Sequence, residues 1–211
     1  MFAALCLSAN VANACDTALI LTIDVSNSID TVEYHLQTDG MADAVLDAEV
    51  SEALIQGQVA VAVIQWSGVD RQELSIPWRQ LRTVGDVQDF AVVARTMPRA
   101  FVQSDTAPGD AILFALDQFA DAPECDRQVI DISGDGPPNA GSDTRLASRE
   151  AERRGVTING IAIESLGVAI TNFFSRSLIT RDGFVITARR HRDYPRAIRE
   201  KILREVSRIF G

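Results

Sequence analysis

The chain has 211 residues, 46% of them hydrophobic and 23% charged, so it has an ordinary globular composition and can bury a core without metal or disulfide support. Its net charge of −9 excludes a general nucleic-acid binder, because polyphosphates bind to basic surfaces. The charge is uneven. Residues 176–211 hold ten Arg and Lys against four Asp and Glu, a net +6, so residues 1–175 carry −15. We interpret the basic end as a solvated helix face, or as a docking surface for an acidic partner or an anionic membrane.

The first fourteen residues, MFAALCLSANVANA, are typical of the later part of a secretory signal peptide. An apolar stretch at residues 2–7 precedes the tripeptide ANA at residues 12–14, a small-residue cleavage pattern. The basic start of such signals is missing, so Met1 lies inside a longer signal, or the stretch is a frayed hydrophobic terminus. No apolar run reaches the ~20 residues of a membrane span. We expect export to the periplasm or the cell exterior. Lipid anchoring through Cys15 is the less favoured alternative, because Ala12 poorly matches the larger aliphatic residue of lipoprotein signals.

Cys15 and Cys125 are the even pair that remains when Cys6 leaves with the signal peptide. Each precedes an apolar run, ALILTID after Cys15 and VIDIS after Cys125. If these runs are neighbouring parallel strands, the two cysteines arrive side by side, with Cα atoms ~5.5 Å apart as a disulfide requires. An oxidising compartment would preserve such a bond. We therefore predict a Cys15–Cys125 disulfide, with two unpaired buried thiols as the alternative.

Short apolar runs alternate with helical patterns along the rest of the chain. We expect a buried strand at residues 18–23 and a helix at 32–53, where apolar residues recur at helical spacing. QVAVAVIQW predicts a strand at 58–66, and QELSIPW predicts an edge strand at 72–78, because Pro77 cannot donate to a ladder. The later expected elements are helices at 84–97, 109–120, 144–154 and 194–210, and strands at 129–133, 156–163 and 183–189.

This alternation predicts an α/β fold with a doubly wound, mostly parallel, Rossmann-like central sheet and helices on both faces. The sequence has no linker, low-complexity segment or internal repeat, so we expect residues 15–211 to form one domain after a partial signal peptide at 1–14. Sheets of this kind bind ligands at the carboxyl ends of their strands. Functional residues are therefore expected in the loops that follow strands.

Three such loops carry oxygen-bearing side chains. Asp24, Ser26 and Ser28 follow the first strand, Thr106 lies in QSDTAPGD, and Asp135 lies in GDG after the strand VIDIS. In an extended segment alternate residues point to one side, so the first three can converge on one ion. Two carboxylates and three hydroxyls, without His or Cys, suit Mg²⁺, Mn²⁺ or Ca²⁺ and suit zinc poorly. The alternative is that these residues only cap helices and form turns.

The same residues resemble a known family. DVSNS after an apolar strand is similar to the D-x-S-x-S signature of von Willebrand factor type A (VWA) domains, TAPGDAI resembles the family's second loop, and DISGDG resembles its third. The phrases VIQWSG and VIDISGDG are similar to a bacterial branch of the family. The resemblance covers nearly the whole chain after residue 14, and it implies a metal-ion-dependent adhesion site (MIDAS) that favours Mg²⁺. The family pattern implies that Ser26 and Ser28 bind the ion directly, and that Thr106, Asp24 and Asp135 bind it directly or through water.

By this resemblance the chain is an exported module that captures a protein partner's Asp or Glu at the open position of the ion. The third loop reads SGDGPPN where better-known members have Thr-Asp-Gly, and its two prolines stiffen the rim. Asp105 and Asp110 add carboxylates beside Thr106, which attract a cation or repel an acidic ligand. Trp66 and Trp78 are expected to pack in the core and at the sheet edge.

A metal-dependent hydrolase, such as a phosphoesterase, is the main alternative, because Mg²⁺ with an open position can polarise a phosphoryl oxygen or activate water. Against it, we expect no His or Lys near the loops as a general base, and no positive residue to hold a phosphate. His35 and His191 lie far apart, and the chain has no G-x-x-x-x-G-K-[ST] or G-x-G-x-x-G motif. A scaffold whose ion only stabilises the fold is the third possibility.

Overall fold

A twisted sheet lies at the centre of the computed structural model, which describes residues 15–164 and 169–207. Its six strands within that part of the chain are β1 (Thr17–Asp24), β2 (Ala60–Trp66), β3 (Gln72–Gln80), β4 (Arg127–Gly134), β5 (Thr157–Ile163) and β6 (Val185–Ala188). They lie in the order β3-β2-β1-β4-β5-β6, and every neighbouring pair is parallel except β2 and β3. The chain winds outward from β1 in both directions, so the carboxyl ends of β1 and β4 lie where the winding reverses.

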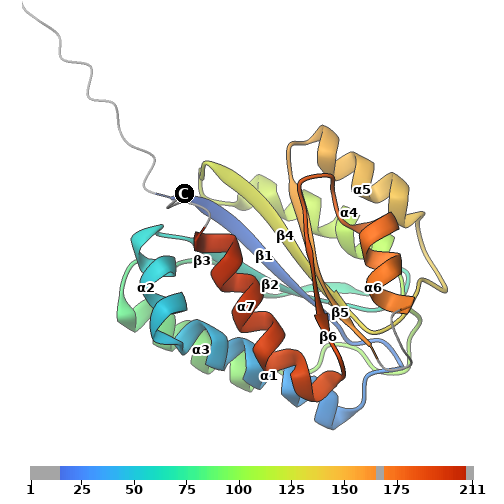
Figure 1. Ribbon diagram of the computed structural model, residues 1–211, viewed down its shortest axis with the longest axis horizontal. Coiled ribbons are helices and arrows are strands. Elements are labelled where there is room, and N and C mark those ends of the chain that lie inside the picture. The colour runs from blue at the N-terminus through green and yellow to red at the C-terminus, as the bar shows by residue number, and fades with distance from the viewer. Residues whose placement is uncertain (1–14, 165–168, 208–211) are drawn as a thin grey trace, which may run out of the picture.

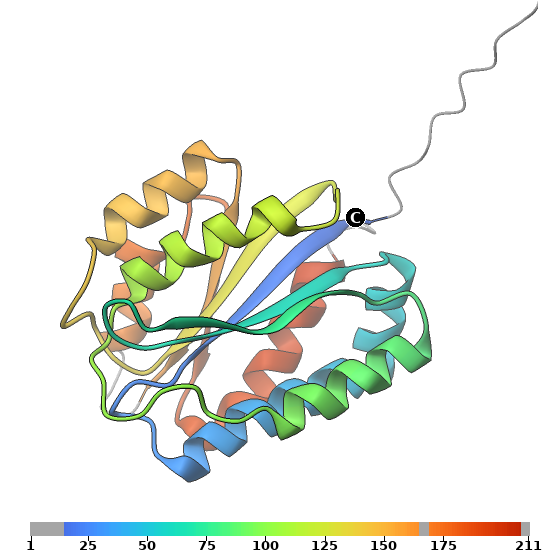
Figure 2. The ribbon, with the colours of Figure 1, turned by 180° about the vertical axis from the view of Figure 1, so that it is seen from behind.

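Helices cover both faces of this sheet, as Figure 1 shows from one side and Figure 2 from behind. The helices on one face are α1 (Thr31–Leu46), α2 (Ala48–Gln56), α3 (Val84–Thr96) and α7 (Tyr194–Val206). Those on the other face are α4 (Pro108–Gln118), α5 (Thr144–Arg153) and α6 (Ala169–Phe173), which continues into a π-helical turn at Phe174–Leu178. Two short 3-10 helices lie at Phe119–Asp121 and His191–Asp193. The predicted doubly wound α/β architecture is confirmed.

The central strands are buried on both faces, which is why they read as nearly continuous apolar runs. In β1, Leu19, Leu21 and Ile23 pack with the α1, α3 and α7 layer, whereas Ala18 and Ile20 pack with the α4 and α5 layer. All five are at most 2% exposed. A strand with one solvent-exposed face would alternate apolar and polar residues, so the continuous apolar pattern is that of a parallel sheet between two helical layers.

Strand β3 closes one edge of the sheet, as its proline predicts. It is antiparallel to β2, and Pro77 lies on it without breaking the strand. Trp78 packs its ring against Phe119, with centroids 5.7 Å apart, and its Nε1 donates to the Gln118 carbonyl at 3.0 Å. Trp66 is buried in the core. Both tryptophans therefore have the packing roles expected of them.

The structure divides one of the expected helices and adds a helix that the sequence pattern does not predict. The helix predicted at 32–53 is two helices, because Asp47 has extended backbone (φ −56°, ψ 135°) and its carboxylate accepts hydrogen bonds from the Glu49 and Val50 amides that begin α2. Helix α6 and its π-helical turn occupy a segment for which the sequence pattern predicts nothing. The last helix ends as an α-helix at Val206, and its predicted extension to residue 210 lies largely outside the described residues.

Cys15 and Cys125 are joined by a disulfide bond, with their Cα atoms 4.6 Å apart. Around it, the Asp126 amide donates to the Cys15 carbonyl at 3.0 Å, and the Arg127 amide donates to the Asp16 carbonyl at 3.1 Å. The bond lies where β1 and β4 begin, at the amino edge of the sheet. The predicted signal peptide, with Cys6, lies outside the described residues. Among the helices of residues 15–164 and 169–207, none has the length and apolar character needed to cross a bilayer.

Candidate metal site

The loop after β1 gathers three of the predicted ligands. Asp24 is the last residue of β1 and is fully buried, and its Oδ1 accepts a hydrogen bond from the Ser26 amide at 2.8 Å. The Oγ atoms of Ser26 and Ser28 lie 3.2 Å apart. The alternation D-x-S-x-S thus places both hydroxyls together and folds the chain back onto the aspartate that begins the motif.

Asp135 joins this group from the neighbouring strand. Strand β4 pairs in parallel with β1, with Ser133 opposite Ile23, and Asp135 follows its last residue. The Ser28 hydroxyl donates to Asp135 Oδ1 at 2.6 Å. Since the carboxyl ends of adjacent parallel strands meet at one edge, two loops that are far apart in sequence share one cluster.

Thr106 reaches the same edge through the second loop. Its amide donates to Asn139 Oδ1 at 2.8 Å, and its carbonyl accepts from the amides of Asn139 (3.0 Å) and Ala140 (3.3 Å). Thr106, Asn139 and Ser28 line one pocket. The structure therefore brings all five sequence-predicted residues to one edge, four of them linked by hydrogen bonds and Thr106 across a shared pocket.

Asp24 keeps one oxygen without a partner. Its Oδ2 is buried and accepts no hydrogen bond of normal length among the described residues. Burial raises the pKa of Asp24 to about 7. Hydrogen bonds from Ser26 and from the Asp135 amide oppose this increase, and the charge of Asp135 adds to it. A buried carboxylate oxygen without a donor needs a proton or a cation for neutralisation.

Gly134 places no side chain against this oxygen. A Cβ at position 134 would lie 3.2 Å from Asp24 Oδ2 and 3.3 Å from Trp66 Cζ2. In the described part of the chain, no three His, Cys, Asp or Glu side chains form a metal-ligating group, so any ion at this edge would need hydroxyl oxygens as well as carboxylates. Carboxylates with Ser and Thr hydroxyls are a hard oxygen set that fits a divalent cation such as Mg²⁺.

Arg99 and Gln37 hold the first loop, and the sequence did not point to either. The Arg99 guanidinium donates to the carbonyls of Val25 (2.9 Å) and Ser26 (3.0 Å). Gln37 Nε2 donates to the Asp24 carbonyl at 3.1 Å from α1. Gln37 is completely buried on the inner face of α1 beside Thr38, a position that the helical spacing assigns to the core.

His191 lies beside the cluster, which corrects the expectation that no histidine approaches these loops. Its Nε2 lies 3.3 Å from Asp135 Oδ2 and 3.5 Å from Glu33 Oε1. Burial disfavours the charged ring, but the hydrogen bond with Asp135 and the charge of Glu33 outweigh it, so the pKa of His191 is raised. The 3-10 helix after β6 carries this ring to α1, a tertiary placement that linear spacing does not reveal. His35 is exposed on α1, away from the cluster.

The two extra carboxylates of the second loop differ in role. Asp110 Oδ1 accepts the Ser142 amide at 2.8 Å and so ties α4 to the third loop. Gly109 permits this contact, because a Cβ there would lie 2.2 Å from the Ser142 carbonyl oxygen. Asp105 is exposed at the rim of the pocket that Ser28 and Thr106 line. Asp110 is thus a structural residue, while Asp105 faces any incoming ligand.

The chain matches one family model and several solved structures. A family model described as "Protein of unknown function (DUF1194)" matches residues 14–210. A search of curated proteins gave no match.

Solved structures share the fold at low sequence identity. Proximal thread matrix protein 1 from the mussel byssus matches with a TM-score of 0.67 and 18% identity over 89% of this chain and 47% of its own. A further structure of that mussel protein is described as having a zinc-occupied MIDAS motif. The pilus adhesin SpaC from Lactobacillus rhamnosus GG matches with a TM-score of 0.67 and 12% identity over 93% of this chain and 31% of SpaC.

The vWF domain of the type V pili tip protein Mfa5 from Porphyromonas gingivalis matches with a TM-score of 0.64 and 10% identity, over 93% of this chain and 97% of that domain. The present chain spans about half the length of the mussel protein. At these identities the likeness shows the fold, which is the VWA fold.

Proposed function

Since the chain belongs to the DUF1194 family and adopts the VWA fold, we propose that it is an exported binding module that captures a protein partner through a divalent ion. Asp24, Ser26, Ser28, Thr106 and Asp135 would hold the ion, Mg²⁺ in the first place and Mn²⁺ or Ca²⁺ as alternatives. An Asp or Glu side chain of the partner would complete its coordination. When bound, the ion supplies a close positive charge for that carboxylate in a partly dry cleft.

The unpartnered oxygen of Asp24 carries this proposal. It is buried, the adjacent residue Gly134 places no side chain against it, and the hydroxyls of Ser26 and Ser28 are in the same cluster. A cluster built only for turns and caps would satisfy its buried carboxylate with backbone amides. Here Oδ2 accepts no hydrogen bond of normal length among the described residues, which leaves it available to a cation.

Export is supported by the disulfide. A Cys15–Cys125 bond persists in an oxidising compartment and would be reduced in most cytosols. A sulfur in a disulfide cannot also carry a lipid thioether, so the bond and lipid anchoring at Cys15 exclude each other. SpaC is described as a pilus adhesin and Mfa5 as a pili tip protein, which is in keeping with a role in adhesion outside the cytoplasm.

Thermal unfolding of residues 15–211 in EDTA, Mg²⁺, Mn²⁺ and Ca²⁺ tests the metal site. An ion at 100 times its dissociation constant should add about 2.7 kcal/mol, or several degrees in Tm. Asp24→Ala should lose this gain, and Asp105→Ala, which removes an exposed carboxylate at the same rim, should keep it. Equal responses of the two variants would contradict the proposed ligand set. Affinity capture of partners with and without EDTA then separates a binding module, which loses its partner in EDTA, from a scaffold with a structural ion.

A metal-dependent hydrolase is the second candidate, because His191 supplies a histidine that the sequence did not predict near the site. The ring is only 6% exposed, its Nε2 faces Asp135 and Glu33, and its buried Nδ1 has no partner among the described residues. The ring borders the hollow between the turn after β6 and the start of α1, but its Nε2 is engaged by Asp135, so it orients that carboxylate, which favours the binding module. Mg²⁺-dependent hydrolysis of p-nitrophenyl phosphate that is lost in His191→Gln would reverse this order.

A further inference from the structure

Arg190 and Arg192, here called the arginine pair, flank the residue that touches the candidate metal site. They lie on either side of His191 in the turn that follows β6, and His191 Nε2 is 3.3 Å from Asp135 Oδ2. Strand β6 is parallel to its neighbour, so this turn lies at the same carboxyl edge of the sheet as Asp24 and Asp135. Two exposed cations therefore stand next to the place where the proposed ion would bind.

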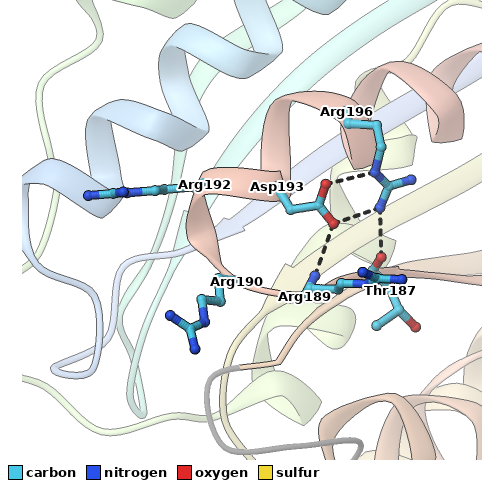
Figure 3. Close-up of a pocket in the computed structure, with 6 residues that line it drawn as sticks. All are labelled: Thr187, Arg189, Arg190, Arg192, Asp193 and Arg196. Atoms are coloured by element: carbon cyan, nitrogen blue, oxygen red, sulfur yellow. Dashed lines mark hydrogen bonds and ion pairs between the residues drawn. The ribbon is translucent and has the colours of Figure 1, made fainter.

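The arginine pair is not used by the fold. Figure 3 shows the interactions around this turn: Arg196 binds Asp193 and the Thr187 carbonyl, and the Arg189 amide also donates to Asp193. The side chains of Arg190 and Arg192 point away from that network (Figure 3). Both are exposed, and within the described residues neither guanidinium makes an ion pair or a hydrogen bond.

Hollows open on both sides of the pair. Arg190 and Arg192 line a cavity of about 820 Å³ together with Arg189, Arg196 and Asp193, whose carboxylate is paired with Arg196. They line another cavity of about 630 Å³ with Asp30 and Glu33 at the start of α1. Asp30 and Glu33 are acidic, so their interactions decide whether the charges of the arginine pair are already neutralised within the protein.

Those two acids are committed to starting α1. Asp30 Oδ1 accepts the Glu33 amide at 2.8 Å, and Glu33 Oε2 accepts the Asp30 amide at 2.9 Å, which is a complete capping box. The other Glu33 oxygen faces His191 at 3.5 Å. Among the described residues, no carboxylate oxygen lies within 4 Å of the guanidinium nitrogens of Arg190 or Arg192, so their charge is free to meet a ligand.

We infer that the arginine pair binds a second acidic side chain of the same partner, so that the partner's recognised segment is an acidic cluster and not a single Asp or Glu. This inference rests on the proposed function. The guanidinium fork matches a carboxylate with two parallel hydrogen bonds. An extended segment covers ~3.3–3.6 Å per residue, so an acid a few residues from the metal-bound one can reach the pair.

An acidic protein segment fits this surface better than an anionic membrane. Membrane-binding segments usually carry about four to eight basic residues at the surface. The turn after β6 presents three exposed arginines, at positions 189, 190 and 192, and the whole chain has a net charge of −9. The position beside the candidate metal site also favours a ligand that is already fixed there by one carboxylate.

Two synthetic peptides test the inference by NMR titration of the ¹⁵N-labelled protein in Mg²⁺ and in EDTA. One has a single Asp in a Gly/Ser sequence, and the other adds two Glu residues three and four positions after that Asp. Arg190→Gln/Arg192→Gln is compared with Arg79→Gln/Arg82→Gln. The control pair carries the same charge change at the amino edge of the sheet, where β3 pairs with the start of β2.

In Mg²⁺ the acid-rich peptide should bind the wild type about three- to tenfold more tightly than the single-Asp peptide, the size expected for two exposed ion pairs. The Arg190→Gln/Arg192→Gln variant should lose this preference and keep its affinity for the single-Asp peptide. The control variant should keep both.

Equal binding of the two peptides to the wild type in Mg²⁺, or equal losses in the two double variants, would overturn the role of the pair and leave metal-dependent capture standing. Binding of neither peptide, or binding that ignores EDTA, would overturn the proposed function and the inference with it. Vesicles of phosphatidylcholine and phosphatidylglycerol form a separate arm. Pair-dependent vesicle binding without a preference for the acid-rich peptide would assign the pair to a membrane and overturn the inference.

Discussion

At the scale of single residues, Asp24 and Gly134 together shape the candidate metal site. Asp24 brings a carboxylate into the core, and Gly134 lets the backbone of β4 pass close to the buried oxygen, where even a single Cβ would be too close. The D-x-S-x-S pattern allowed Asp24 to be predicted as a ligand. The close approach of Gly134 to Asp24 results from the pairing of β1 with β4, so it could not be predicted from the sequence pattern.

Gly134→Ala should weaken divalent-ion binding about fivefold or more while the protein still folds. Its Cβ would press on Asp24 Oδ2 and Trp66, and overpacking of this kind costs ~1–3 kcal/mol. Gly136→Ala is the matched control, because a Cβ there meets nothing within 4 Å. Calorimetric Mn²⁺ titration and urea unfolding of both variants measure the two effects. Equal affinities would show that the space beside Asp24 is not part of the site.

The pKa of Asp24 predicts a metal affinity that rises with pH. Burial raises that pKa from 3.8 to about 7, so the ion-free folded protein keeps the proton up to near-neutral pH. The native state then binds more protons than the unfolded chain between about pH 4 and 7, and the ion-free protein loses stability as pH rises through that window. A divalent ion competes with the same proton. Its affinity should increase from pH 5 to 7 and level off above about 7.

Calorimetric titrations with Mn²⁺ at pH 5, 6, 7 and 8, in buffers of different ionisation enthalpy, would detect the released proton. Urea unfolding in EDTA across the same pH range should show the opposite slope, and Asp24→Asn should flatten it. An affinity independent of pH would mean that Asp24 is ionised before the ion arrives.

At the scale of elements, a buried ion pair fixes α7 to the sheet. Lys201 of α7 and Asp131 of β4 contact each other through Nζ and Oδ1, and they are 0% and 4% exposed. Burial raises the pKa of Asp131 and lowers that of Lys201, against their mutual attraction. Each partner therefore depends on the other to remain in the core.

Lys201→Met should lower the free energy of unfolding by ~3–5 kcal/mol, because it leaves a buried carboxylate without its partner. Lys201→Met/Asp131→Leu should lose less than the two single variants together. Arg199→Met, on the same helix, removes a half-buried pair with Asp47 and an exposed pair with Glu49, and it should cost less than the Lys201 substitution. Chemical denaturation of the wild type and of the four variants, Asp131→Leu among them, measures these differences. Additive losses would show that the pair acts as two independent side chains.

The elements also show what a sequence pattern can and cannot predict. Apolar periodicity located every strand and most helices, since burial on both faces of the sheet leaves a direct trace in composition. It missed the break at Asp47, where the carboxylate that ends α1 caps α2 without disturbing the apolar spacing. It also missed His191, because the contact with Asp135 depends on a 3-10 turn folding back across the sheet edge.

At the scale of the whole molecule, the disulfide and the candidate site lie at opposite edges of the sheet. The bond links positions 110 residues apart and joins the starts of β1 and β4, while Asp24 and Asp135 lie at the ends of the same strands. Stability and binding are thus expected to separate when the bond is removed.

Cys15→Ser and Cys125→Ser should each lower the free energy of unfolding by ~2–5 kcal/mol, the usual effect of losing a native disulfide. Reduced wild type should match both variants. Metal affinity of the folded protein should stay within about twofold, since the site does not contact the bond. Urea unfolding with and without dithiothreitol measures the first effect, and Mn²⁺ titration measures the second. Unchanged stability in both variants would show that the bond does not constrain the chain.

The Cys15–Cys125 bond also has a consequence for the order of folding events. Strands β1 and β4 are central neighbours, yet the chain must close a loop of more than a hundred residues before they can pair. Parallel pairing across such a separation is slow, because loop entropy is lost before contacts form. In a chain whose disulfide is already formed, the starts of β1 and β4 are held together, so the two strands can pair without first closing this long loop. The refolding rate of this domain should therefore depend on the redox state in which folding begins.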